Sequence, residues 1–391
     1  ASATKVNPKP KMILINCSGG GVRSALWNVL VMQKVDSIAN GSLMKNTTLI
    51  TGASGGMLGA AYYRELYHRT LNGKNENIKS PLHLERISKD LLNAVSFTLL
   101  VNDTYNPFHS IDKWGHNYPV DRGLAFEKQF HDNTKGILDK NIFDYKTPES
   151  DGIIPMMVLS PIITNDAKTL IISPQNTSYL SKPILHFSQR FTNEIEGVEF
   201  RRLFKEHDAD SLRFSTALRM SATFPYIMPS INLPSKPRLE VMDAGMRDNF
   251  GTWLSIKYLF TFRKWIKENT SGVIILQIRD TPKLYPKDKD QTQSLIRRVF
   301  NPIGNFFTNW HEIQDLQIDN LIGTSLAWFD HELDFIRFQY YPSQNEKRAS
   351  LSWHLTSKEK KEIIKSIDNA TNQSSLKQLE RLLNQNIVVV N

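Results

Sequence analysis

A serine flanked by glycines stands where a strand pattern gives way to a helix pattern. In the stretch ITGASGGML, Gly52, Ser54 and Gly56 form Gly-x-Ser-x-Gly, with small residues between them. Between a strand and a helix, this pattern is typical of a nucleophile elbow, a sharp turn with little room for side chains. The amides and the positive dipole end of the following helix would face the serine oxygen. Ser54 is therefore the candidate nucleophile, although five residues alone also fit a plain glycine-rich turn.

Three consecutive glycines, Gly19, Gly20 and Gly21, follow the first strand pattern. Bare backbone amides in such a turn form an anion nest. A nucleotide P-loop would end in Gly-Lys-Ser/Thr, whereas Val22 and Arg23 follow here, and the spacing of a dinucleotide-binding loop is absent. An oxyanion hole for an acyl-transfer intermediate fits better. Arg23 would then hold a substrate phosphate or steady the loop.

A carboxylate ends a later strand pattern. In VMDAGMRDNFG (241–251), Asp243 follows an apolar run and precedes small residues, and strand ends in α/β proteins are where active sites form. A simple turn aspartate is the alternative interpretation, and Asp248 fits a helix-capping or turn role better than a catalytic one. The preceding stretch predicts a helix broken by Pro225 and Pro229, which would place a rigid loop beside Asp243.

Taken in order, Gly-Gly-Gly-x-Arg, Gly-x-Ser-Gly-Gly and Asp-Ala-Gly resemble the motifs of the patatin-like phospholipases, which are related to cytosolic phospholipase A2. The Ser-Ala-x-x-Pro-x-x-x-Pro stretch from Ser221 and the Asp-Asn-x-Gly stretch at 248–251 also resemble that family. The resemblance covers about 11–75 and 150–280. The last motif reads Asp-Ala-Gly where Asp-Gly-Gly or Asp-Gly-Ala is usual, a departure of one methyl group.

The resemblance implies a Ser–Asp dyad that works without a histidine and without a cofactor. Ser54 would attack the ester carbonyl of a lipid, and Asp243 would accept its proton. The amides of Gly20 and Gly21 would bind the oxyanion, with Gly19 shaping the turn. An ordinary aspartate has a pKa of about 3.9 and is a weak base at neutral pH, so partial burial must raise its pKa. We therefore expect phospholipase A or lysophospholipase activity and no metal, since no cluster of side chains has ligand spacing.

Two alternatives stay open. An α/β-hydrolase with a Ser-Asp-His triad would add His311, His331 or His354 to the serine and the aspartate in that chain order. None of these histidines sits in a recognisable turn after a strand. The other alternative is a non-catalytic module that keeps the fold and binds a membrane or a partner.

The elements around these residues indicate an α/β fold. KMILINC (11–17) and TTLITGAS (47–54) are strand patterns, and helix patterns follow them at 23–38 and 55–71. Strand, glycine turn, helix, strand, tight turn and helix in this order are the opening of a doubly wound sheet. Together with the resemblance, they predict a three-layer patatin-like sandwich: a central mostly parallel sheet, helices on both faces and extra C-terminal helices. Further strands are expected within 152–164, 167–174, 238–245 and 271–279.

We expect a catalytic domain over 1–285 and a largely helical extension over 286–391 packed on it. An insertion or cap at about 75–150 would carry helices near 82–100 and 121–132. Near the C-terminus, a capping box at Thr356 and Glu359 opens one amphipathic helix, and a leucine stripe marks the next. That stripe consists of Leu376, Leu379, Leu382 and Leu383.

An aliphatic and aromatic stripe occupies 294–313 and is interrupted at Asn301 and Pro302. The interruption predicts two short helices, with Asn301 as N-cap and Pro302 as the first helical residue. The stripe would either face the core or lie at a lipid interface, with Arg297 and Arg298 near the headgroups.

Charge and composition limit the partners. The 391 residues carry 48 Lys and Arg against 39 Asp and Glu, a net charge of +9, which serves solubility or attracts an anionic partner. Without RNA-binding or zinc-finger motifs, a membrane surface is expected and nucleic acid is not. One cysteine excludes an internal disulfide, and no apolar run reaches the ~18 residues of a membrane span.

The chain begins at Ala1, so a signal peptide or membrane segment could have been removed. We expect a cytoplasmic or peripheral membrane protein, or the soluble domain of a larger membrane-attached one. The oligomeric state does not follow from the sequence.

Overall fold

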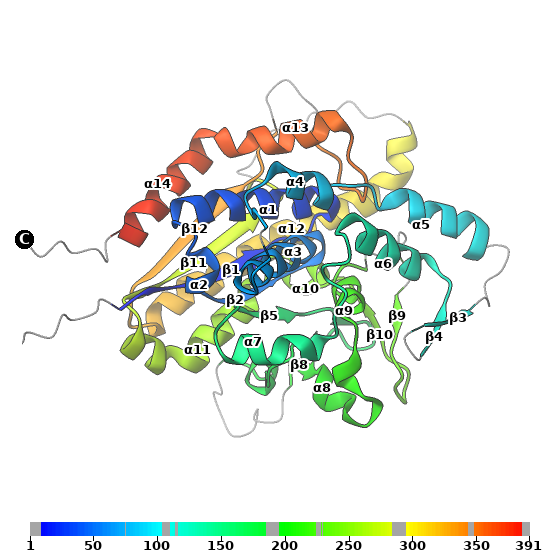
Figure 1. Cartoon of the computed structure of the whole chain (residues 1–391), viewed down its shortest axis with the longest axis horizontal. Helices are drawn as coiled ribbons and strands as arrows, with labels where there is room; N and C mark the ends of the chain where they lie inside the picture. The colour runs from blue at the N-terminus through cyan, green and yellow to red at the C-terminus, as the bar shows by residue number, and fades with distance from the viewer. Residues whose placement is uncertain are drawn as a thin grey trace, which may run out of the picture.

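A five-stranded parallel sheet forms the centre of the protein (Figure 1). The computed structural model describes residues 9–384 apart from residue 75 and the segments 104–109, 114–115, 185–194, 224–227, 229, 284–294 and 343–347. Every pair of neighbouring strands in the central sheet is parallel, which confirms the predicted α/β class. In spatial order the strands are β12 (Leu333–Gln339), β11 (Gly272–Arg279), β1 (Lys11–Cys17), β2 (Thr47–Gly52) and β5 (Met156–Leu159).

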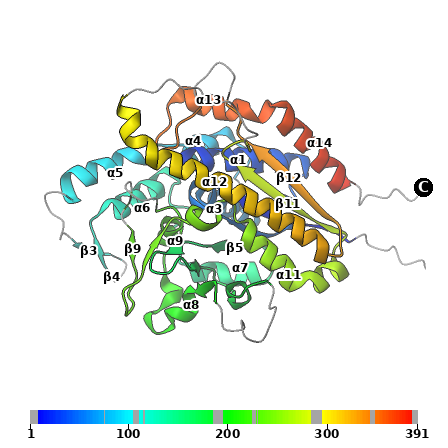
Figure 2. The same cartoon turned by 180° about the vertical axis from the view of Figure 1, so that it is seen from behind.

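Alternate residues of β1 point to opposite faces of this sheet, as the two-residue repeat of a strand requires. Ile13, Ile15 and Cys17 enter a larger core, whereas Met12 and Leu14 enter a second core on the other face. Figure 2 shows α11 and α12 in front of the sheet, on the side opposite to α1 and α3. The larger core lies beneath α1 (Gly21–Ile38), α3 (Ser54–Leu71), α13 (Ser357–Lys365) and α14 (Ala370–Asn384), and the second beneath α11 (Thr252–Asn269) and α12 (Leu295–Trp328).

A second, mixed sheet adjoins the end of β5, where Leu159 and Ile172 form a bridge. Its strands, in spatial order, are β8 (Gly197–Glu199), β7 (Thr169–Ile171), β6 (Ile162–Ile163), β10 (Glu240–Met242) and β9 (Ile231–Asn232). The strand expected before Asp243 is β10, which pairs antiparallel with β6 and β9. The candidate base therefore follows a strand of the second sheet, while Ser54 follows a strand of the central one.

The predicted helical stretch near 82–100 is two helices, α4 (Pro81–Ile87) and α5 (Leu92–Thr98). Asp90 restarts the helix because its carboxylate accepts the amides of Leu92 and Asn93 at 3.0 and 3.2 Å. The stretch near 121–132 is α6 (Arg122–Asn133). The remaining α-helices and strands are short: α2 (Leu43–Asn46), α7 (Lys146–Ser150), α8 (Phe200–Leu203), α9 (Phe214–Met220), α10 (Gly245–Asp248) and the hairpin β3 (Ser110–Lys113) and β4 (His116–Pro119).

The region after residue 285 differs from expectation in two ways. The predicted break at Asn301 and Pro302 is wrong, because α12 runs through both residues. A proline removes one intrahelical hydrogen bond, and the helix continues on the bonds at either side. The unpredicted strand β12 pairs with β11 along its length, which joins this region to the central sheet. The domain division at 285 stays a prediction.

The side chains of 295–309 and 311 lie outside the described residues, so the choice between a core stripe and an interfacial stripe also stays open. Within the described end of the stripe, the indole of Trp310 donates to the Met246 carbonyl at 2.8 Å, and Ile313 is exposed. The two C-terminal helices are confirmed, with the capping box at Thr356 and Glu359 present.

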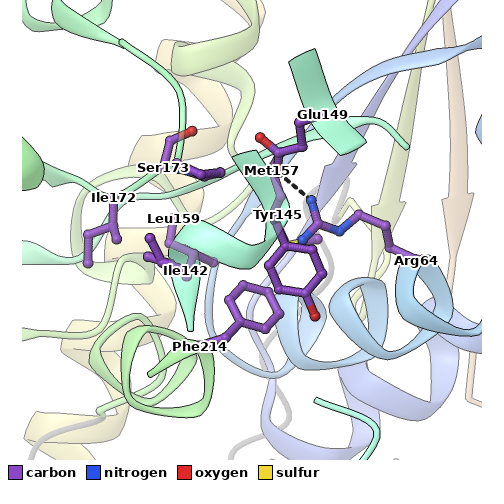
Figure 3. A pocket seen from close by; sticks show the side chains of 10 residues that line it. Arg64, Ile142, Tyr145, Glu149, Met157, Leu159, Ile172, Ser173 and Phe214 are labelled. Atoms are coloured by element: carbon purple, nitrogen blue, oxygen red, sulfur yellow. Dashed lines mark hydrogen bonds and ion pairs between the residues drawn. The ribbon is translucent and has the colours of Figure 1, made fainter. Parts of the chain in front are cut away.

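A buried ion pair anchors α3 to α7 (Figure 3). Arg64 donates to Glu149 at 2.5 Å, and its guanidinium lies 4.4 Å from the centre of the Tyr145 ring. Burial raises the pKa of Glu149 to about 7, while the charge of Arg64 opposes that shift. The pocket beside this pair measures about 10 Å³, roughly the space of one water molecule. The ion pair has a structural role: it ties the second half of α3 to α7, away from Ser54 at the start of that helix.

Candidate active site

The turn between β2 and α3 holds Ser54 in a strained backbone conformation. Ser54 has φ 48°, in the left-handed region, and is 6% exposed. A Cβ atom at Gly52 would lie 2.0 Å from the Cys17 carbonyl oxygen, and one at Gly56 would lie 2.2 Å from that of Ser18. Only glycine fits at both positions. The Gly-x-Ser-x-Gly stretch thus has the geometry of a nucleophile elbow, with strain at the residue that would react.

Asp243 meets Ser54 through a shared backbone scaffold. The Ser54 amide donates to the carbonyl of Ser221 at 3.0 Å, and the Asp243 amide donates to that of Thr223 at 2.9 Å. The Ser54 side chain lies close enough to the Asp243 carboxylate, which is 3% exposed, to lower the pKa of that carboxylate by hydrogen bonding. The structure therefore brings together two residues that follow strands of different sheets.

The surroundings of Asp243 make its carboxylate more basic than usual. Burial raises the pKa of Asp243 to about 6, and hydrogen bonds from the Ser54 hydroxyl and the Gly245 amide, the latter at 2.7 Å, act in the opposite direction. At neutral pH this carboxylate is mostly ionised, yet it holds a proton more readily than an ordinary aspartate with a pKa of about 3.9. Such a group can accept a proton from a hydroxyl that it already contacts.

The glycine triplet links β1 to α1, which begins at Gly21. The Gly19 amide donates to both the backbone and the side-chain oxygen of Asn249, each at 3.1 Å. The amides of Gly20 and Gly21 have no acceptor within the described part of the chain. Neither amide is therefore committed to a protein acceptor, as an oxyanion donor requires; Gly20 is partly exposed and Gly21 is buried.

This loop leaves no space for a side chain. A Cβ atom at Gly20 would lie 2.0 Å from Oδ2 of Asp280, and one at Gly21 would lie 2.4 Å from the Ser352 carbonyl oxygen. Their φ angles are 144° and 60°, a region that favours glycine. Alanine at either position would displace the loop, so it would not isolate the contribution of one amide.

Arg23 is buried behind the glycine triplet. Its Nη2 pairs with Oδ2 of Asp280 at 2.5 Å, and its Nη1 donates to the Ala349 carbonyl at 2.6 Å. The Asp280 amide donates to the hydroxyl of Ser18, the residue just before the triplet, at 2.8 Å. Of the two roles predicted for Arg23, these contacts favour support of the loop over binding of a phosphate.

The comparison with protein families identifies the chain. The model of the family described as patatin-like phospholipase matches residues 17–255, which include the glycine triplet, Ser54 and Asp243. The chain belongs to the patatin-like phospholipase family. Family membership supports lipid acyl hydrolysis in general as the activity.

Solved structures resemble this patatin-like chain only distantly. VipD from Legionella pneumophila is 10% identical with a TM-score of 0.35, and the match covers 97% of this chain and 69% of VipD. Human GIVD cytosolic phospholipase A2 is 9% identical with a TM-score of 0.45, covering 99% of this chain and 64% of that one. Its complex with methyl gamma-linolenyl fluorophosphonate is 13% identical with a TM-score of 0.43, covering 99% and 60%. The chain thus spans less than two thirds of the phospholipase, and no curated protein matches it.

The triad alternative finds no histidine partner in the described ranges of this patatin-like protein. His331 contacts the Thr270 hydroxyl at 3.3 Å, and His354 contacts Asp90 at 3.1 Å. The side chain of His311 lies outside the described residues. The described hydrogen bonds to the Asp243 carboxylate come from serine and a backbone amide, not from imidazole.

Three supporting residues escaped the sequence analysis as functional candidates. Asp280 directly follows β11, so the strand-end argument used for Asp243 would have found it. Asn249 lies in a motif of the family resemblance, yet its bond to Gly19 joins segments far apart in the sequence. Gln314 accepts the Asn249 amide and donates to the Gly245 carbonyl, both at 2.9 Å, from a helix without any motif.

The remaining predictions near the site have mixed outcomes. The N-cap position of α11 is Gly251, but the Asp248 carboxylate accepts the amides of Thr252 and Trp253 at 3.1 and 3.0 Å, so Asp248 holds the start of α11 from the preceding turn. Pro225 and Pro229 lie outside the described residues. In the described ranges, no three His, Cys, Asp or Glu side chains converge as metal ligands. Across the same residues, every helix is too short or too polar to cross a membrane.

Proposed function

We propose that the protein hydrolyses acyl ester bonds of phospholipids, as a phospholipase A or a lysophospholipase, through a Ser54–Asp243 dyad. One observation carries the proposal: a strained serine lies close enough to a buried carboxylate, whose pKa burial raises, to oppose that rise by hydrogen bonding. Membership of the patatin-like phospholipase family supports the substrate class.

In the proposed reaction, Ser54 Oγ attacks the ester carbonyl carbon while Asp243 takes the hydroxyl proton. The amides of Gly20 and Gly21 bind the oxyanion of the tetrahedral intermediate, each contributing ~3–4 kcal/mol. The intermediate collapses, and the leaving alkoxide takes the proton from Asp243 to depart as an alcohol. Water then attacks the acyl-enzyme and gives its proton to Asp243. Collapse releases the fatty acid and returns the proton to Ser54.

An alkyl fluorophosphonate tests the nucleophile directly. We expect one covalent adduct on Ser54, located by peptide mass spectrometry, and loss of fatty-acid release from phospholipid vesicles in proportion to labelling. Ser221→Ala serves as the control, because it alters a nearby serine and should keep the adduct. Labelling of another residue with full inhibition would refute the assignment. Vesicle binding without hydrolysis would favour the non-catalytic module.

The raised pKa of Asp243 predicts the acid side of the pH profile. The base works when ionised, so kcat/KM should be half-maximal near pH 6, level off about one pH unit above it and fall by about tenfold per pH unit well below it. Rates of hydrolysis of a soluble ester, measured from about pH 4 to about pH 8, give this profile. An inflection near pH 4, typical of an ordinary aspartate, would show that burial does not tune the base.

We further propose that the substrate is reached at an anionic membrane surface. The net charge of +9 supports this, as do Phe97 and Leu100, which are 66% and 67% exposed on neighbouring turns. Binding to anionic vesicles should exceed binding to neutral ones and weaken with salt, because the Debye length is about 10 Å at 0.1 M. Sedimentation with vesicles measures both effects. Phe306→Ser with Phe307→Ser should reduce vesicle binding and spare a soluble ester if the stripe is interfacial, whereas unfolding would identify it as core.

A further inference from the structure

A lysine-rimmed groove opens between α1, α4 and α13, away from the candidate active site. Figure 1 shows α4 and α13 packed along α1, and both helices contact it. The groove has a volume of about 530 Å³, within the roughly 300–1,000 Å³ of sites that hold small molecules. Its lining begins at Leu30, nine residues beyond Gly21, and extends to Ser37. At 1.5 Å per residue, this stretch of α1 lies about 14–24 Å from the glycine triplet, so the two sites are separate.

Four lysines surround the groove: Lys34 on α1, Lys79 before α4, and Lys361 and Lys365 on α13. All four are exposed, and none forms an ion pair with a described carboxylate. Burial raises the pKa of the nearby Asp36, and the charge of Lys79 opposes that rise. One acidic residue, Asp368, shares the lining. Lys361 and Lys365 are one turn apart, a spacing at which like charges repel. An anion in the groove would relieve this repulsion.

The walls between the lysines are mostly apolar. Leu84 and Ile367 are buried at the base, and Ile364 stands between Lys361 and Lys365 with 37% of its surface exposed. An inorganic anion would use the lysines and leave this apolar surface in water. A molecule with both an anionic end and a hydrocarbon chain would use the lysines and the apolar walls together.

We propose that this groove is a second binding site that takes the anion of a single-chain fatty acid. The carboxylate lies among the four lysines, and the acyl chain lies along Leu84, Ile364 and Ile367. The site is distinct from the proposed dyad, and the proposal does not depend on hydrolysis.

Isothermal titration of the whole chain with decanoate, octanoate, 1-decanol and inorganic phosphate tests the proposal. Decanoate should bind more tightly than each of the other three, and each buried CH₂ group lost should weaken binding by up to about fourfold. Lys361→Glu with Lys365→Glu should weaken decanoate binding by about tenfold or more, because each reversal replaces an attraction with a repulsion. The matched control, Lys264→Glu with Lys377→Glu, makes the same change in net charge on exposed positions outside the groove and should bind decanoate like the unmodified chain.

Ile364→Ser tests the contribution of the acyl chain of decanoate separately from that of its carboxylate. It should weaken decanoate binding severalfold and leave phosphate binding unchanged. Equal weakening by the groove and control pairs would show a diffuse charge effect, and phosphate or 1-decanol binding as tightly as decanoate would show a simple anion or apolar site. Each of these results overturns the proposal. If the α13 pair fails to fold, Lys34→Ala with Lys79→Ala repeats the test with the lysine on α1 and the lysine that precedes α4. All variants should keep their activity on a soluble ester, so a failure here is distinguishable from failure of the dyad.

Discussion

Ser54→Ala and Asp243→Asn are each expected to lower kcat on a phospholipid by a factor on the order of 10⁴ and to leave the melting temperature close to that of the unmodified protein. The loss is large because both residues act on one proton transfer, as members of a catalytic unit do. For the same reason, the double variant should be little slower than either single one. Initial rates of fatty-acid release and thermal melts measure the two quantities.

Asp243→Asn should not destabilise the protein. Burial disfavours the ionised carboxylate, as its pKa of about 6 shows, and asparagine keeps an oxygen to accept the Gly245 amide. Asp248→Asn is a matched control, because burial also raises the pKa of Asp248 to about 6 but its bonds go to the start of α11. It should retain activity within about tenfold of wild type. A Ser54→Ala protein with wild-type turnover would end the dyad proposal.

The sequence could predict those features whose signal is local. The strand patterns of β1 and β2, the glycine turns after them and the helices α1 and α3 all lie within one stretch of chain and were placed within a residue or two. Ser54 and Asp243 were selected because each stands at a strand end beside small residues. Their contact, however, depends on two sheets meeting, which no local pattern contains.

Features set by tertiary packing escaped prediction. β12 has apolar residues on both faces, with an arginine and an aspartate among them, so its sequence lacks a clear strand pattern. Its pairing with β11 is what makes it a strand. Pro302 indicates a helix start by its type, yet α12 continues through it. The role of Arg23 could not be chosen from sequence either, since Asp280 is its partner from a distant strand end.

Arg23→Ala is expected to destabilise the fold by about 3–5 kcal/mol, because it leaves the carboxylate of Asp280, 3% exposed, without its ionic partner. The same carboxylate lies beside Gly20, so the loop that would bind the oxyanion should shift as well. We therefore expect kcat/KM to fall equally for a phospholipid and for an uncharged short-chain ester. Urea unfolding gives the free energy, and parallel assays on the two substrates give the ratio of the losses.

Two comparisons make this result specific. Arg64→Ala breaks the other buried ion pair described above and should cost similar stability, but it is remote from the glycine triplet and should spare kcat at a temperature where both variants are folded. Arg23→Met with Asp280→Leu removes both charges, so it should recover stability relative to Arg23→Ala without restoring activity if the ion pair positions the loop. A loss confined to phospholipid, with the uncharged ester turned over normally, would instead assign Arg23 to the phosphate. That outcome requires the guanidinium to leave Asp280 when substrate binds. Arg23→Ala would then still destabilise the free protein by the same amount, but the glycine triplet would still be able to bind the oxyanion.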